Sequence, residues 1–323
     1  MIQGRVLSFG IAAAALSLAC GASSDSPPTG LPTVVTAPAK PNPPSPPNFP
    51  TGPPPQVEYV YVANADGSGE TKVAAGGRAA WSPDGRRLAF HRDGAIRVIN
   101  ADGSNETKLL PGFAPSWSPN GQRIAFSDSA GLEMMDADGS NKTLLLRHDF
   151  RDDTYQAWDM GPAKPVWSPD GKRIAFEHLG DGDTQPAQVF VMNADGSNLH
   201  RVSVNPGQIH YAESDPAWSP DGKSLAYWSY GYGIVITDAD GGSPQPVFSD
   251  FPLVAYGTKP AWSPDGASLF FGSFRYSTTQ LARSTVALTL QTSALRLFIL
   301  DAYDLVVAPD GKHVAYTRSE TIK

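Results

Sequence analysis

A five-residue motif recurs along this chain and constrains its fold more than any other feature. Five copies of Trp-Ser-Pro-Asp-Gly, one with Asn for Asp, begin at Trp81, Trp117, Trp167, Trp218 and Trp262. A weaker sixth copy, Val-Ala-Pro-Asp-Gly, begins at Val307, and successive copies are 36, 50, 51, 44 and 45 residues apart. A repeat of this length built from short strands is typical of the blades of a β-propeller.

The residues that follow each motif predict four strands per repeat. An apolar run comes after the Gly, as in Leu88-Ala89-Phe90, and a second alternating segment follows, as at 189–192. That segment ends in a turn such as Asn-Ala-Asp-Gly-Ser at 193–197, and a short last strand precedes the next motif. The sequence therefore predicts an all-β, six-bladed propeller of four-stranded antiparallel blades.

The motif has the chemistry of a tight turn. Pro sets φ at the second turn position, Asp suits the third, and Gly tolerates a left-handed fourth, which predicts a hairpin between the first and second strands. The Asp-Gly-Ser turns join the third and fourth strands in the same way. A calcium loop is the alternative, but the copy at 136–141 lacks the Glu that an EF-hand needs at its twelfth position. The large ring of each motif Trp is interpreted as packing between blades.

The two ends of the repeat region complement each other. The C-terminal copy, at about 304–317, has only the first two strands of a blade, whereas the segment from Val57 resembles a third strand and its turn. We expect the N-terminal segment to complete the last blade and close the ring, which removes two exposed sheet edges.

The N-terminus has the pattern of an export signal. Arg5 precedes an uncharged, apolar stretch from Val6 to Ala19, which is short for a membrane span and typical of a signal peptide. The stretch ends at Cys20, the single cysteine, and resembles a bacterial lipoprotein signal in which that cysteine is lipidated. An ordinary signal peptide cleaved near Ala19 or Ala22 is the alternative.

A proline-rich linker follows the signal. Its composition cannot form a core and favours extended polyproline II, so it is either a stalk or a passive tail. The predicted organisation is a signal peptide over 1–19, the linker over 20–56 and the propeller over 57–323. We expect an exported, membrane-anchored lipoprotein facing the periplasm or the cell surface, or otherwise a soluble periplasmic or secreted protein.

The repeats resemble those of TolB and related WD40-like propellers. The resemblance rests on the Trp-Ser-Pro-Asp-Gly copies, their apolar runs and the Asp-Gly-Ser turns, and it covers about 57–319. TolB itself carries an additional N-terminal α/β domain, where this sequence has only the signal and the linker. The chain is therefore similar to TolB-like propeller lipoproteins rather than to TolB proper.

The sequence contains none of the motifs that would indicate an enzyme. It has no Gly-x-Ser-x-Gly elbow, no His-Glu-x-x-His and no Cys-x-x-Cys. His200 and His210 lie in one inter-blade stretch and are candidates to share a metal, since some polysaccharide lyases with propeller folds use such clusters, but their spacing here is no known motif. The net charge of -7 argues against nucleic-acid binding. We predict no catalytic residues, no cofactor and no metal site.

Loop lengths indicate which face binds a partner. In a propeller blade, the first-to-second and third-to-fourth connections share one face, and here they are uniformly short. The other face receives the long segments at 147–164, 180–187, 205–215 and 249–259. Insertions on one face of a repeat protein often mark its binding face. These segments and one further turn supply the candidate partner-binding residues Arg151, Tyr155, Trp158, His210, Tyr211, Tyr230, Tyr232, Phe251 and Tyr256.

The sequence thus supports a non-catalytic propeller of the cell envelope that binds a protein or a peptide. We expect a monomer that contacts the membrane only through its lipid anchor. The alternative is a surface protein that binds or cleaves polysaccharide, with its aromatic loops stacked on sugar rings. A structural scaffold without a small ligand is the third hypothesis.

Overall fold

The computed structural model of this chain describes most of the repeat region. The described residues are 56–147, 163–179, 187–203, 213–229, 232–248, 259–276, 281–292, 294–300 and 302–321. The chain divides into two compact units, Met1–Thr51 and Gly52–Lys323, and all described residues belong to the second. Within them, no helical segment has the length and apolar character needed to cross a membrane.

The described elements are 24 β-strands. The first eight are β1 (Gln56–Asn64), β2 (Thr71–Ala75), β3 (Gly77–Trp81), β4 (Arg87–Arg92), β5 (Ala95–Asn100), β6 (Thr107–Pro111), β7 (Phe113–Trp117) and β8 (Arg123–Asp128). The next eight are β9 (Gly131–Asp136), β10 (Thr143–Arg147), β11 (Ala163–Trp167), β12 (Arg173–Leu179), β13 (Ala187–Asn193), β14 (His200–Arg201), β15 (Glu213–Trp218) and β16 (Ser224–Ser229). The last eight are β17 (Gly233–Asp238), β18 (Gln245–Phe248), β19 (Ala261–Trp262), β20 (Ser268–Tyr276), β21 (Leu281–Thr289), β22 (Ala294–Leu300), β23 (Tyr303–Val307) and β24 (His313–Thr321).

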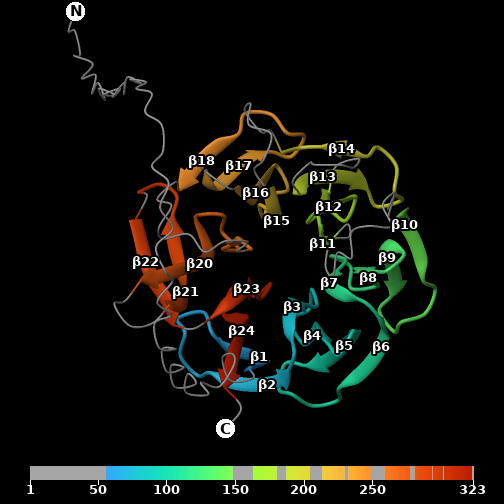
Figure 1. Cartoon of the computed structure of the whole chain (residues 1–323), viewed down its shortest axis with the longest axis horizontal. Coiled ribbons are helices and arrows are strands. Elements are labelled where there is room, and N and C mark those ends of the chain that lie inside the picture. Colours follow the sequence, from blue (N-terminus) through green and yellow to red (C-terminus); the bar gives the residue numbers. More distant parts are fainter. Residues whose placement is uncertain are drawn as a thin grey trace, which may run out of the picture. The chain divides into compact units, whose positions relative to one another are not determined.

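These strands form six four-stranded antiparallel sheets, so the predicted six-bladed propeller is confirmed. Blades one to five are β3–β6, β7–β10, β11–β14, β15–β18 and β19–β22. The sixth blade has the order β2-β1-β24-β23 and so combines strands from both ends of the repeat region. Figure 1 shows β3, β7, β11, β15 and β23 nearest the middle of the ring and β2, β6, β10, β14, β18 and β22 at its rim.

The sixth blade is joined by a long register. β1 pairs with β24 over nine consecutive residues, from Gln56 opposite Thr321 to Asn64 opposite His313. Side chains reinforce this pairing, because Arg318 of β24 donates two bonds of 2.7 and 2.8 Å to the carboxylate of Glu70, which lies between β1 and β2. Bidentate pairs of this kind combine charge with fixed geometry. The two ends of the repeat region are therefore held together by both backbone and side chains.

The motif tryptophans lie at the junctions between blades. Trp81, Trp117, Trp167 and Trp218 are buried. The Trp218 indole N–H donates to the Val166 carbonyl of the preceding blade at 3.1 Å, and Trp262 donates to Ala217 in the same way. The Arg173 guanidinium also stacks on the Trp218 ring, 4.7 Å from its centre. Trp218 and Trp262 thus tie their inner strands to the blade before them.

The hairpin turns of the motif satisfy their own polar groups. In the first copy, the Ser82 hydroxyl donates to the Asp84 carboxylate, and the Arg87 amide donates to the Ser82 hydroxyl at 2.9 Å. Asp84 also accepts the Arg86 amide at 3.1 Å. The third, fourth and fifth copies repeat these bonds. We call the end of the propeller that carries these hairpins and the Asp-Gly-Ser turns the turn face.

The junction of the fifth and sixth blades departs from the pattern because Val307 replaces the motif tryptophan. An opening of about 310 Å³ lies there, lined by Pro264, Phe270, Val307 and Gly311 among others. Phe270 stands where the other five repeats have Ala, in the apolar run after the motif. The larger phenyl ring thus occupies part of the space that an indole fills elsewhere.

Candidate functional site at the mouth of the central channel

The inner strands of five of the six blades carry a β-bulge near the end opposite the turn face. In the first blade the register shifts between Gly77 and Ala80, and the second, third, fourth and sixth blades shift at the same place. The bulged residue has a left-handed φ of 50–59° at Arg78, Ala114, Lys164, Asp215 and Asp304. Such a conformation is unfavourable for a residue with a side chain, and bulges commonly re-aim side chains next to functional sites.

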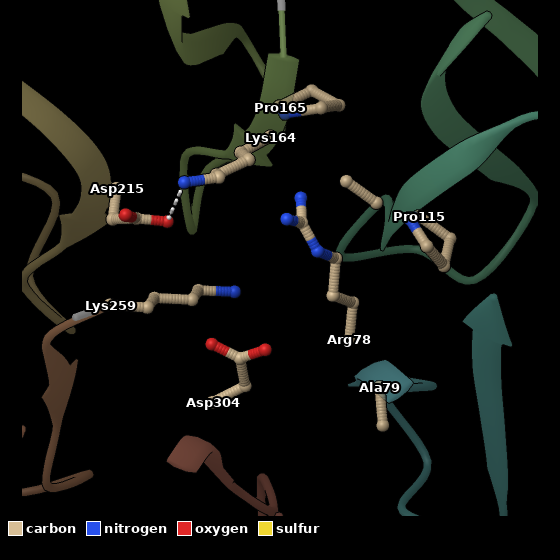
Figure 2. A pocket seen from close by; sticks show the side chains of 9 residues that line it. Arg78, Ala79, Pro115, Lys164, Pro165, Asp215, Lys259 and Asp304 are labelled. Atoms are coloured by element: carbon tan, nitrogen blue, oxygen red, sulfur yellow. Dashed lines mark ion pairs between the residues drawn. The ribbon is translucent and has the colours of Figure 1, made fainter. Parts of the chain in front are cut away.

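The bulged residues share one position in the repeat, three residues before the motif tryptophan. From blade one to blade six, the position holds Arg78, Ala114, Lys164, Asp215, Lys259 and Asp304. All six line one cavity, so five charged side chains from five blades converge on the channel. Figure 2 shows Arg78, Lys164, Asp215, Lys259 and Asp304 directed toward the same space. We call this set the channel-mouth ring.

One part of the ring is a compact ion cluster. The Lys164 ammonium lies 2.7 Å from the Asp215 carboxylate and 3.3 Å from that of Glu177, the β12 residue paired with Ala163. Asp215 is nearly fully buried, with 3% of its surface exposed, and it also accepts a bond from the Ser214 hydroxyl at 3.1 Å. The cluster thus places two carboxylates around one ammonium group.

The close approach of these groups shifts the pKa values of Glu177 and Lys164. Burial and then the charge of Asp215 raise the pKa of Glu177 to about 7, although Lys164 opposes the shift. Burial alone would lower the pKa of Lys164, but the charges of Asp215 and Glu177 outweigh it and the pKa is raised. Glu177 is therefore a proton-exchanging group near neutral pH, beside an ammonium that stays charged.

The other part of the ring holds Lys259 and Asp304. Burial lowers the pKa of Lys259, and the charges of Asp304 and Asp215 only partly offset this effect. Burial likewise raises the pKa of Asp304 against the opposing charge of Arg78. Among the described residues, no carboxylate lies within ion-pair distance of the Lys259 ammonium. The surroundings of Lys259 therefore disfavour its charged form.

The cavity enclosed by the ring has a volume of about 70 Å³. Since about 10–15 Å³ of such volume accommodates one water molecule, the space holds several waters or one small polar group. Its walls combine the charged side chains with Ala79, Pro115 and Pro165. The arrangement can bind a polar ligand group by charge and hydrogen bonds.

The repeats that position the ring match a known family. Residues 132–323, more than half of the chain, match the model of the TolB beta-propeller domain. The chain belongs to the TolB beta-propeller domain family. The predicted resemblance to TolB-like propellers is thus confirmed. No curated protein sequence matches this TolB-family propeller.

Solved structures share the fold of this TolB-family propeller at low sequence identity. A TolB-like protein from Agrobacterium tumefaciens is 20% identical, with a TM-score of 0.66, over 83% of this chain and 100% of that one. TolB from Acinetobacter baumannii is 15% identical, with a TM-score of 0.55, over 82% of this chain and 65% of that one. An oligogalacturonate lyase from Vibrio parahaemolyticus is 13% identical, with a TM-score of 0.53, over 80% and 82%. At these identities the likeness concerns the fold.

Most residues predicted to bind a partner lie outside the described part of the chain. These are Arg151, Tyr155, Trp158, His210, Tyr211, Tyr230, Phe251 and Tyr256, and Cys20 lies outside it too. Tyr232 is described; it is partly buried and packs against the apolar cluster that contains Trp218 and Val235. Of the two histidines considered as metal ligands, His200 bonds to the Asn198 carbonyl at 2.9 Å and His210 is outside the described residues.

Sequence reasoning missed the channel-mouth ring. The signal was present, because aligning the six repeats on their motif shows charged residues at the third position before it in five copies. The ring lies at the end of the blades opposite the turn face. The inner strands begin at the end opposite the turn face, and the segments that enter them there include the long insertions at 147–164, 205–215 and 249–259. The described residues at which these segments enter the inner strands therefore lie at the same end of the blades as the ring.

Proposed function

We propose that this TolB-family propeller is a non-catalytic binding scaffold of the cell envelope. A protein or peptide partner docks on the face that carries the inter-blade insertions, which we call the mouth face. The channel-mouth ring supplies charged contacts at the centre of that face, and the inserted aromatic residues supply the surrounding anchors.

One observation carries this proposal. A repeat position with a recurrent, unfavourable backbone conformation holds Arg, Lys and Asp side chains instead of one repeated residue. Residues that serve only the fold recur from blade to blade, as Ser82 and Asp84 do. Charged groups that differ between blades and have displaced pKa values are characteristic of binding sites.

Partner capture by paired variants tests the choice of face. A crosslinking pull-down from envelope membranes first isolates the partner with the wild-type protein. Trp158→Ala and Tyr211→Ala should then reduce capture at least tenfold while the melting curve is retained, because truncating a buried interfacial aromatic commonly costs about 2 kcal/mol or more. Asp84→Ala and Asp170→Ala, on the turn face, are the matched controls and should capture normally. The proposal fails if folded turn-face variants lose the partner while the Trp158 and Tyr211 variants keep it.

The cellular location forms part of the same proposal. If the protein is exported and lipidated at Cys20, Cys20→Ala should move it from the membrane fraction to the soluble periplasmic or extracellular fraction. Unchanged membrane association of the variant would contradict lipid anchoring. A soluble wild-type protein would support the alternative of a cleaved, unanchored export signal.

A polysaccharide ligand is the second candidate function. It is favoured by the three cations of the ring, Arg78, Lys164 and Lys259, which suit acidic sugars, and by the fold shared with oligogalacturonate lyases, one of them described in complex with manganese. Bound Mn²⁺ or Ca²⁺ in the purified protein, together with the release of unsaturated products from oligogalacturonate, would support it. A partner captured without any effect of the sugar would count against it.

A further inference from the structure

We infer that the channel-mouth ring binds one carboxylate group beside Lys259, and that Lys259 is retained there at the expense of the stability of the unliganded fold. The inference rests on the proposed function for the choice of face and adds the chemistry that the channel recognises. It concerns a carboxylate of either a free small acid or the carboxyl terminus of a polypeptide.

The position of the Lys259 ammonium points to an anion as its partner. Its side chain lines the cavity and extends between Asp215 and Asp304 toward Arg78 (Figure 2). Asp215 is already committed to Lys164 at 2.7 Å and to Ser214 at 3.1 Å. Within the described part of the chain, Lys259 itself has no ion pair. A partly buried cation without an ion pair is costly, so an anion entering the cavity would gain a strong partner.

The net charge of the ring limits the charge of the ligand group. Three cations, Arg78, Lys164 and Lys259, face two carboxylates of the ring, Asp215 and Asp304, and Glu177 adds a third carboxylate beside Lys164. With Glu177 protonated the set carries one net positive charge, and with Glu177 ionised it carries none. With Glu177 protonated, a group with one negative charge therefore balances the site, whereas a doubly charged phosphate would leave it negatively charged.

The size of the cavity limits the size of the ligand group. The cavity of about 70 Å³ has room for a carboxylate in place of a few waters. Its mixed walls provide two kinds of partner at once, cations for the carboxylate and carboxylates for a neighbouring ammonium or hydroxyl of the same ligand. A small acid or a chain end fits this combination.

Calorimetry and melting curves with defined acids test the inference. The probes are acetate, the free dipeptide Gly-Gly and amidated Gly-Gly, each against sodium chloride at matched ionic strength. We expect acetate or Gly-Gly to bind and to raise the melting midpoint through mass action, and amidated Gly-Gly to bind at least tenfold more weakly than Gly-Gly. Binding of acetate indicates a free small acid as a sufficient ligand, and binding of Gly-Gly alone indicates a chain end.

The variant Lys259→Met separates binding from folding. It should weaken carboxylate binding at least tenfold and also raise the midpoint of the unliganded protein, because an unfavourably placed cation is removed. A residue with only a structural role would not give this opposite pair of effects. Lys223→Met, which removes an exposed turn-face ammonium, should change neither. If Lys259→Met does not fold, Lys259→Arg keeps the charge and should keep measurable carboxylate binding.

The inference is overturned if neither acetate nor Gly-Gly binds the folded wild-type protein, if amidated Gly-Gly binds as tightly as Gly-Gly, or if Lys259→Met binds carboxylates as tightly as the wild type. Failure of partner capture on the mouth face would not produce either result. The tests of the carboxylate site and of the docking face are therefore independent of each other.

Discussion

The two ends of the inner strands use the same backbone in opposite ways. At the turn face, the Ser and Asp of the hairpin recur, and each turn bonds its own side chains to its own amides. The Ser82 and Ser168 hydroxyls are the main reason that the pKa values of Asp84 and Asp170 are lowered. At the mouth, the bulged position changes from blade to blade between Arg, Ala, Lys and Asp.

This difference separates the residues that stabilise the propeller from the residues that are available to bind a ligand. The polar groups of the turn face bond to one another within each hairpin, so the hairpins alone explain why these residues recur. The mouth gathers charges that burial disfavours, as the lowered pKa of Lys259 and the raised pKa of Asp304 indicate. Groups kept against their preferred protonation state often mark functional sites.

The largest loss of stability should follow from removing the strands that close the propeller, because both ends of the inner strands depend on it. Deleting 57–73 removes all of β1 except Gln56 and three of the five residues of β2, and it exposes the edge of β24 along eight of its nine paired residues. The shortened protein should unfold or aggregate, since an unpaired edge is open to other chains. Deletion of 21–50, measured by the same thermal melt, should leave the midpoint nearly unchanged. Similar behaviour of the two deletions would contradict the role assigned to β1.

A smaller loss should follow from emptying one blade junction. Trp218→Ala removes a buried indole, its bond to Val166 and its contact with Arg173, and should lower the free energy of unfolding by about 3–5 kcal/mol. Asp170→Ala, within one exposed hairpin, should lower it by about 1 kcal/mol. Urea unfolding of both variants gives the comparison. Equal losses would show that the junctions are not the main determinant of stability.

How far the sequence predicts this molecule depends on which end of the strand is considered. The hairpins, the strand count and the motif tryptophans repeat, so periodicity alone indicates the blades. The channel-mouth ring does not repeat in residue type, and only its constant distance from the motif links Arg78 to Asp304. Glu177 is harder still to find, because it reaches Lys164 and Asp215 from the neighbouring strand rather than from the bulge.

The smallest effect concerns the pH dependence of stability at the mouth. The pKa of Glu177 is raised from 4.5 to about 7 in the fold, so the folded state holds its proton more tightly than the unfolded state. Its contribution to stability is complete below about pH 4.5 and is lost as the pH rises toward 7. Glu177→Gln should therefore flatten the decline of the unfolding free energy across this range, as followed by urea titrations at several pH values. An unchanged slope would show that Glu177 titrates normally.

Site-specific photo-crosslinking tests the assignment of the two faces most directly. A benzoylphenylalanine is placed either at Tyr211, in a predicted mouth-face insertion, or at Leu199, an exposed residue beside the Asp-Gly-Ser turn at 195–197 on the turn face. Both proteins are then irradiated with the captured partner. The account predicts a covalent adduct from position 211 and none from position 199. An adduct from position 199 alone would contradict the mouth as the binding end of the propeller.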